Sequence, residues 1–303
     1  MSDRRPLYRR SARWAPSLAA IAVMGLAPMA SGEMLMEGFE DGAVGAKPDA
    51  DAVRPNNNVS DVAATVIAPG DNAAGSGQGL NLLDDNDGTG PQGSDASLAY
   101  ENNFVTDSSS NVSSAAISFD IARNSDLSDG TNDSERLTFS VREFVDSDSA
   151  ELNSSSDRIL EIRFQADGEF RVDGGNGNTS RDAGELAVGE SNNVQVFIND
   201  DESNTLDFIA PDGSTGTLAA NSFFVFLNGE LVNGDEANTL EQGAVGNSAS
   251  LGRAGFISFN SSSGLDYDVD NFTVGEVPIP EPNSMGLLAA CGLMLFRRRK
   301  NAA

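Results

Sequence analysis

The side chains that could carry out chemistry in this chain are almost all carboxylates. The sequence has 46 Asp and Glu residues, no histidine, and one cysteine, Cys291. Without an imidazole, the usual serine and cysteine triads lack their base, and the commonest metal ligand is missing as well. Two kinds of chemistry remain possible: binding of Ca²⁺ by hard oxygen ligands, and catalysis by paired carboxylates. Asp266, Asp268 and Asp270 alternate along one stretch, so we expect them on one face of a strand.

Two further acidic runs, Asp84 to Gly88 and Asp126 to Glu135, look like calcium-binding loops. Neither continues into a full EF-hand loop with its glutamate at position 12 and its flanking helices. Such runs also arise by chance in a chain this acidic, so both interpretations stay open.

Net charge narrows the range of partners. Residues 33–277, the body of the chain, hold ten basic and 44 acidic residues, a formal charge of about −34. Such a chain repels nucleic acid and anionic membranes, so we expect no nucleic-acid partner. The charge attracts divalent cations, or simply keeps the protein soluble. With one cysteine there is no intrachain disulfide, so the body depends on its own core or on metal ions.

The N-terminus has the three-part layout of a secretory signal peptide, which we assign to residues 1–32. Five arginines occur within the first 13 residues, and an apolar run follows from Ala15 to Ala30. Small residues in Ala30-Ser31-Gly32 then form a cleavage site before Glu33. The sequence therefore predicts export through the inner membrane.

The C-terminus carries a second ordered set of signals in residues 278–303. Pro280-Glu281-Pro282 is followed by twelve mostly apolar residues, 285–296, and then by a basic cluster, Arg297, Arg298, Arg299 and Lys300. Twelve residues are fewer than the roughly 20 that a membrane-spanning helix needs. The basic cluster would hold this end on the cytoplasmic side, which predicts a transient membrane anchor.

These residues, in this order and at the end of the chain, resemble the PEP-CTERM sorting signal of Gram-negative bacteria. The resemblance implies that an exosortase, a membrane transpeptidase, processes the chain near Pro280, Glu281 and Pro282, with Arg297–Lys300 as the basic stop. It also implies a place at the cell surface or in the extracellular matrix, in association with exopolysaccharide and biofilm. A plain tail anchor is the alternative.

The body consists of short runs in which apolar and polar residues alternate, separated by clusters of Gly, Asn, Asp and Ser. This pattern is typical of strands and turns. Ile117, Phe119 and Ile121 share one face, as do Leu137, Phe139 and Val141. Asp167-Gly168 and Asn228-Gly229 predict hairpin turns. We expect about a dozen strands, no amphipathic helix, and an all-β sandwich of the jelly-roll type over residues 33–277. The weaker pattern of residues 40–95 suggests long loops.

Three stretches resemble parts of concanavalin A-like (laminin-G-like) jelly rolls: Met36–Gly42 an opening strand, Phe223–Val232 a hairpin, and Asp268–Val274 a closing strand. The resemblance implies that the first and last strands are neighbours. It also implies a structural calcium site there, with Glu37, Glu40 or Asp41 close to Asp268 or Asp270. The alternative is that these acids only form a solvated face.

The sequence indicates the location of this protein more clearly than its function. No Glu-x-Asp-x-Glu or close variant supplies a glycosidase pair, so we expect no enzyme. Trp14 lies in the signal peptide, and only Tyr100 and Tyr267 accompany the phenylalanines in the body. We expect an exported surface or matrix protein with a structural or adhesive role in an exopolysaccharide layer. The alternative is a lectin-like, glycan-binding module or, less favoured, a glycan-cleaving enzyme.

Overall fold

The computed structural model describes residues 35–50, 52–54, 62–84, 98–105, 112–125, 136–143, 158–174, 179–233, 251–259 and 265–280. All the regular structure in these ranges is β-strand, which confirms the predicted all-β class. The predicted signal peptide and the predicted sorting signal from Glu281 onward lie outside these ranges. No helix within them is long and apolar enough to cross a membrane.

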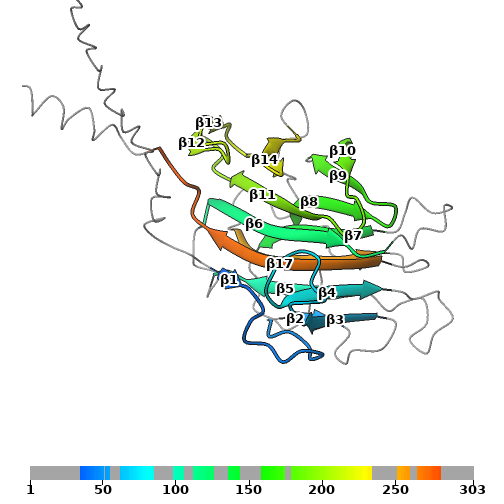
Figure 1. Ribbon diagram of the computed structural model, residues 1–303. Coiled ribbons are helices and arrows are strands. Elements are labelled where there is room, and N and C mark those ends of the chain that lie inside the picture. The colour runs from blue at the N-terminus through cyan, green and yellow to red at the C-terminus, as the bar shows by residue number, and fades with distance from the viewer. Residues whose placement is uncertain are drawn as a thin grey trace, which may run out of the picture. The chain divides into compact units, whose positions relative to one another are not determined.

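Eight strands form the first sheet, and Figure 1 shows β17 in its middle, between β6 and β4. In spatial order the strands are β15 (Glu230–Leu231), β14 (Ser222–Leu227), β11 (Ser191–Asn199), β6 (Ser114–Arg123), β17 (Leu265–Gly275), β4 (Gly79–Asp84) and β3 (Val62–Ile67). β1 (Leu35–Glu37) also pairs with β17, antiparallel. The expected neighbourhood of first and last strands is therefore confirmed.

Seven strands form the second sheet, and two more form a separate hairpin. The seven are, in spatial order, β10 (Thr179–Glu185), β9 (Glu169–Gly174), β8 (Arg158–Gln165), β7 (Arg136–Glu143), β16 (Leu251–Phe259), β5 (Ala99–Asn103) and β2 (Ala52–Arg54). The hairpin consists of β12 (Leu206–Ile209) and β13 (Thr215–Leu218). Every paired strand in the described ranges is antiparallel to its neighbours.

One apolar core lies between the two large sheets. Because side chains alternate along a strand, Ile117, Phe119 and Ile121 of β6 point together into it, as predicted. The ring centroid of Phe119 is 4.9 Å from that of Phe139 on β7 and 5.2 Å from that of Phe256 on β16. Burying each such side chain stabilises the fold by about 1.5–3 kcal/mol. The two sheets therefore form a sandwich.

Both predicted hairpin turns occur, and residues with positive φ make them. Gly168, φ 95°, follows Asp167 between β8 and β9. Asn228 and Gly229, φ 52° and 83°, join β14 to β15. Two consecutive residues of positive φ match the right-handed twist of a two-residue hairpin, and asparagine and glycine tolerate them best.

The expectation of long loops over residues 40–95 is wrong in part. This segment supplies β2, β3 and β4. β4 pairs directly with β17, and its Leu80 and Leu82 are fully buried while Asn81 points away from the core. The strands are short and rich in small or polar residues, so their alternation was hard to distinguish from a loop.

Candidate functional site

Basic residues gather on one of the two sheets. Of the ten in residues 33–277, eight lie on strands of the seven-stranded sheet: Arg54, Arg136, Arg142, Arg158, Arg163, Arg171, Arg181 and Arg253. Lys47 precedes β2. Arg123, the one basic residue on the eight-stranded sheet's described strands, is buried, and its Nη1 donates to the Ala166 carbonyl.

Strand alternation places five of these arginines on the outward face of the sheet. Their chain neighbours, such as Leu137, Ile162 and Phe170, belong to the core. We call this surface the arginine face. It is defined by Arg136, Arg142, Arg163, Arg171 and Arg253 together with Glu101, Glu161 and Glu169.

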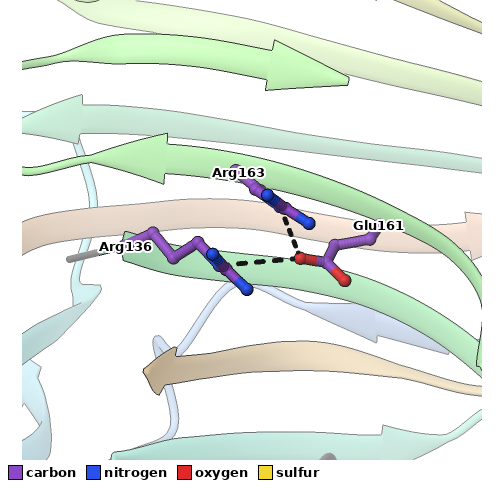
Figure 2. Close-up of polar contacts among 3 residues, drawn as sticks. All are labelled: Arg136, Glu161 and Arg163. Atoms are coloured by element: carbon purple, nitrogen blue, oxygen red, sulfur yellow. Dashed lines mark hydrogen bonds and ion pairs between the residues drawn. The ribbon is translucent and has the colours of Figure 1, made fainter. Parts of the chain in front are cut away.

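Glu161 is the centre of the part of this face drawn in Figure 2. Arg163 Nε donates to Glu161 Oε1 at 2.7 Å, and Arg136 Nε lies 3.7 Å from the same oxygen. The Glu161 side chain is 1 % exposed, against 21 % for Arg163 and 24 % for Arg136. The carboxylate is therefore enclosed while two guanidinium groups reach the surface. On β9, Arg171 Nη2 lies 2.6 Å from Glu169 Oε2, and both side chains are partly exposed.

A second ion pair of the arginine face is completely enclosed. Arg253 Nη1 lies 3.0 Å from Glu101 Oε2, and both side chains are buried. Arg253 Nε also donates to Asn103 Oδ1 at 3.0 Å. This pair bridges β16 and β5 and has a structural function.

Arginines also stand directly opposite one another in the strand register. Arg163 faces Arg171 across β8 and β9, and Arg142 faces Arg253 across β7 and β16. Like charges in direct register destabilise a sheet. Between these pairs lie Thr138 and Ser140, whose buried hydroxyl oxygens have no hydrogen-bond partner among the described residues. The described strands of this sheet therefore bring several guanidinium groups and hydroxyls close together.

The outward face of β17, on the other sheet, is acidic. Asp266, Asp268 and Asp270 point away from the core together, as predicted. Asp268 Oδ1 accepts from Asn81 at 3.0 Å and from Asn124 at 2.7 Å. These two amides also donate to Asp266 Oδ1. Neutral amides thus bridge the two carboxylates.

The segment between β3 and β4 covers this acidic strand. The Ala73 amide donates to Asp268 Oδ2 at 2.8 Å, and Asn72 Nδ2 donates to Asp270 Oδ2 at 3.0 Å. A Cβ on Gly75 would lie 1.9 Å from Asp270 Oδ2, so only glycine allows this approach. Burial raises the pKa of Asp268 and of Asp270, and hydrogen bonds oppose the rise in both.

The five predicted calcium ligands fall into separate groups. Glu40 is near Asp270, and its charge contributes to the raised pKa of that group. Burial raises the pKa of Glu37, and the charges of Asp49 and Asp41 raise it further. Asp268 lies instead beside Asp266.

Within the described ranges no three carboxylates gather closely enough to hold a metal. The calcium site stays a prediction, and of the two acidic runs only Asp84 is described.

The described tyrosines are buried, and two glutamates of the arginine face are far apart. Tyr100 and Tyr267 are both in the core, and Tyr267 donates to the Gln165 carbonyl at 2.5 Å. Burial raises the Tyr267 pKa still further from neutrality. On the arginine face, Glu161 and Glu101 occupy one register row, with Ser140 and Gly255 between them. Three strand spacings put them about 14 Å apart, beyond the roughly 5–9.5 Å of glycosidase carboxylates.

Sequence reasoning missed the arginine face. Its signal was present, because arginine recurs at outward positions of strands whose inward positions are Leu, Ile, Val and Phe. The total charge of the body concealed it, since a sum over the chain ignores which sheet a residue belongs to.

No protein-family model matches this chain, and no curated protein matches it. Solved structures of similar fold include a sialidase (14 % identity, TM-score 0.40, 77 % of this chain and 19 % of that one). They also include the carbohydrate recognition domain of Emp47p, with 9 % identity and a TM-score of 0.41. That match covers 80 % of this chain and 94 % of the Emp47p domain. A third is arcelin-5, a lectin-like defence protein from Phaseolus vulgaris, with 16 % identity and a TM-score of 0.35. That match covers 65 % of this chain and 86 % of arcelin-5. This chain spans about a fifth to a quarter of the length of the sialidases it matches.

Proposed function

We propose that the chain is an exported, exosortase-processed surface protein whose sandwich binds glycan and so has a structural or adhesive role in an extracellular polysaccharide layer. The arginine face is the contact surface. Its partly exposed members, Arg136, Arg163 and Arg171, come from the adjacent strands β7, β8 and β9.

The observation that carries this proposal is the regular array of donors on the arginine face. Each guanidinium presents a planar fork of N–H groups, and the forks are held on a rigid sheet by Glu161 and Glu169. Arg163 and Arg171 are directly opposite one another on adjacent strands, about 4.8 Å apart across the sheet, while Arg136 is opposite Gln165, two residues along β8 from Arg163. A sugar chain, which offers hydroxyl and other oxygen acceptors at regular intervals, complements such an array.

Binding without cleavage fits the positions of the remaining groups. The body's two tyrosines are in the core, and Asp268 and Asp270 are buried beneath the segment between β3 and β4. Glu161 and Glu101 stand too far apart to act as a hydrolytic pair. Glycan binding by the sandwich is therefore favoured over glycan cleavage.

Processing at the C-terminus is compatible with the contacts made just before the Pro-Glu-Pro motif. Val277 is buried, and the Pro278 carbonyl accepts from the Ile209 amide at 2.8 Å. Pro280, the first residue of the motif, comes two positions after Pro278. Cutting near the Pro-Glu-Pro motif would leave the sandwich intact.

Cosedimentation tests the glycan-binding proposal. The purified full-length chain is mixed with extracellular polysaccharide from an exosortase-bearing bacterium that makes flocs or biofilm. We expect the protein to sediment with the polysaccharide and to stay in solution without it. Protein that remains in the supernatant at every polysaccharide concentration would show that the sandwich does not bind that glycan.

A further inference from the structure

The segment that follows β17 is held against the β12–β13 hairpin. The Ile209 amide of β12 donates to the Pro278 carbonyl at 2.8 Å. Val277, one position earlier, is buried in a small apolar cluster with Phe197, Phe208, Leu218 and Phe226. A backbone hydrogen bond and a buried side chain therefore hold two consecutive residues of this segment.

The next two residues are not held in this way. The Ile279 side chain is 60 % exposed, and Pro280 has no backbone N–H to donate. Neither residue makes a hydrogen bond in the part of the chain that the structure describes. The protection given by the hairpin therefore extends to Pro278 and stops before Pro280.

Such protection limits where a peptidase can act. Burial and hydrogen bonding of the backbone decide whether a peptide bond is accessible, and a protected bond is cut only during local opening. A peptidase binds its substrate as an extended strand that includes residues before the bond it cuts. Cutting N-terminal to Pro278 therefore requires release of Val277 and of the Ile209–Pro278 hydrogen bond. Cutting C-terminal to Pro280 requires neither.

We propose that the β12–β13 hairpin sets the position of C-terminal processing, so that the chain is cut C-terminal to Pro280 and residues 276–280 stay on the mature protein. This inference rests on the processing proposed above and adds the structural element that regulates it. The cut peptide bond gives its carbonyl carbon to water or to an acceptor amine, and its nitrogen takes a proton and leaves with the C-terminal segment. The retained residues remain bound along β12.

The spacing of the sequence makes this restraint effective. Six residues, 279–284, separate Pro278 from the apolar segment that begins at Met285. Fully extended, the chain from Pro278 to Met285 spans at most about 25 Å. A membrane enzyme that holds the apolar segment therefore works close to the hairpin, and it reaches residues beyond Pro280 before it reaches Val277.

Digestion of the purified full-length chain with a broad-specificity carboxypeptidase tests the protection. Intact-mass spectra taken over time should show residues being removed from the C-terminus until a species that ends within residues 278–280 accumulates. If trimming proceeds through Val277 without such a species, the hairpin does not protect this segment and the inference is wrong.

Two variants of Ile209 separate protection by the fold from resistance of the proline-containing sequence itself. Ile209→Pro removes the N–H that binds Pro278, and because that N–H is not used by the β12–β13 ladder, the ladder can remain. Loss of this hydrogen bond should speed trimming past Val277 roughly fivefold. Ile209→Val keeps the N–H and should behave as the parent does. Equal rates in the parent and both variants would overturn the inference.

The mass of the protein released from an exosortase-bearing host tests the position of the cut. We expect the C-terminus of the released protein at or beyond Pro280, in the parent and in Ile209→Val. A C-terminus before Pro280 in the parent would overturn the inference while the proposed processing stands. Surface protein that retains residues 285–300 would mean that the processing does not occur, and the inference would fail with it.

Discussion

Arg253 and Glu101 form an ion pair that water does not reach, between β16 and β5. Removing two charges from water is expensive, and their attraction offsets this cost only when geometry and further hydrogen bonds are good. Here Arg253 also donates to Asn103. The pair therefore constrains which strands can be neighbours. Removing one partner should destabilise the protein more than replacing both.

We predict that Glu101→Ala lowers the free energy of unfolding by about 3–5 kcal/mol, since it leaves a buried guanidinium charge. The double variant Glu101→Leu, Arg253→Met should recover most of this loss. Urea unfolding monitored by circular dichroism measures both. Equal losses in the single and double variants would contradict the assigned role of the pair.

Asp268 and Asp270 make stability depend on pH in the opposite sense to an ordinary surface carboxylate. Burial raises the pKa of both above the usual 3.8, with the charge of Asp266 adding to the rise for Asp268 and those of Asp120 and Glu40 for Asp270. Between 3.8 and the raised value the folded state binds more protons than the unfolded state. Their contribution therefore favours folding at low pH and is lost as pH rises through this window.

We predict that this part of the pH dependence disappears in Asp268→Asn. The asparagine oxygen can still accept from Asn81 and Asn124, and the side chain no longer titrates. Melting temperatures measured between pH 4 and pH 7 should fall less steeply with pH in the variant than in the parent protein. Parallel curves would show that Asp268 is ionised equally in both states.

Calcium binding stays a prediction for the same region. We propose that millimolar Ca²⁺ raises the melting temperature by several degrees and that Mg²⁺ at equal ionic strength does less, because Mg²⁺ gives up its water reluctantly. An ion that binds only the folded protein stabilises by about 2.7 kcal/mol at one hundred times its dissociation constant. Asp270→Ala should remove the calcium-specific part. The same shift with both ions would indicate screening alone.

At the scale of elements, the β12–β13 hairpin encloses a second small core. Phe197 and Phe226 point outward from the eight-stranded sheet, since their neighbours on β11 and β14 point into the main core. Phe208 of the hairpin packs on them, with ring centroids 5.1 Å and 6.3 Å away. Val277 belongs to the same cluster, so the hairpin also holds the segment that follows β17.

We predict that Phe208→Ala loosens residues 276–280. Large-to-small changes of a buried phenylalanine cost about 3–5 kcal/mol, and this cost falls on the small core. Limited proteolysis of the full-length chain with mass spectrometry should show faster cleavage near Val277. Thr217→Ala, at an exposed position of the same hairpin, is the matched control. Unchanged protection would mean that the hairpin does not hold this segment.

At the scale of the whole molecule, the predicted targeting segments and the described strands occupy separate parts of the chain. The strands of the sandwich begin with β1 at Leu35, two residues beyond the predicted cleavage site, and end with β17 at Gly275. Both predicted signals lie beyond these limits. None of the buried core residues described between the sheets belongs to them.

We predict that the surface-released protein starts near Glu33 and lacks the C-terminal segment. Mass spectrometry of that fraction should find no peptides from residues 285–300, and finding them would argue against sorting by cleavage. Replacing Pro280-Glu281-Pro282 with alanines should leave export intact and strand the protein in the inner membrane. Normal surface display of this variant would mean that the motif is incidental.

Local sequence determined the strands and turns. The alternation of Ile117, Phe119 and Ile121 and the turns at Asp167-Gly168 and Asn228-Gly229 appear as predicted, because side-chain period and backbone φ are local properties. Pairing of the first strand with the last was also predicted, from resemblance to known jelly rolls. The strands within residues 40–95 were missed, since their short runs gain stability only from their partners β17 and β5.

Only the tertiary structure decided how the charges are distributed. Arg163 and Arg171 meet because β8 and β9 pair in one register, and Arg253 meets Glu101 although the two are far apart in sequence. On the other sheet, Asn81 of β4 and Asn124, which follows β6, donate to the same two carboxylates. Long-range pairing sets such contacts, and composition does not contain it. A chain that sequence alone describes as uniformly acidic therefore folds into a sandwich in which eight of the body's ten basic residues lie on the strands of one sheet.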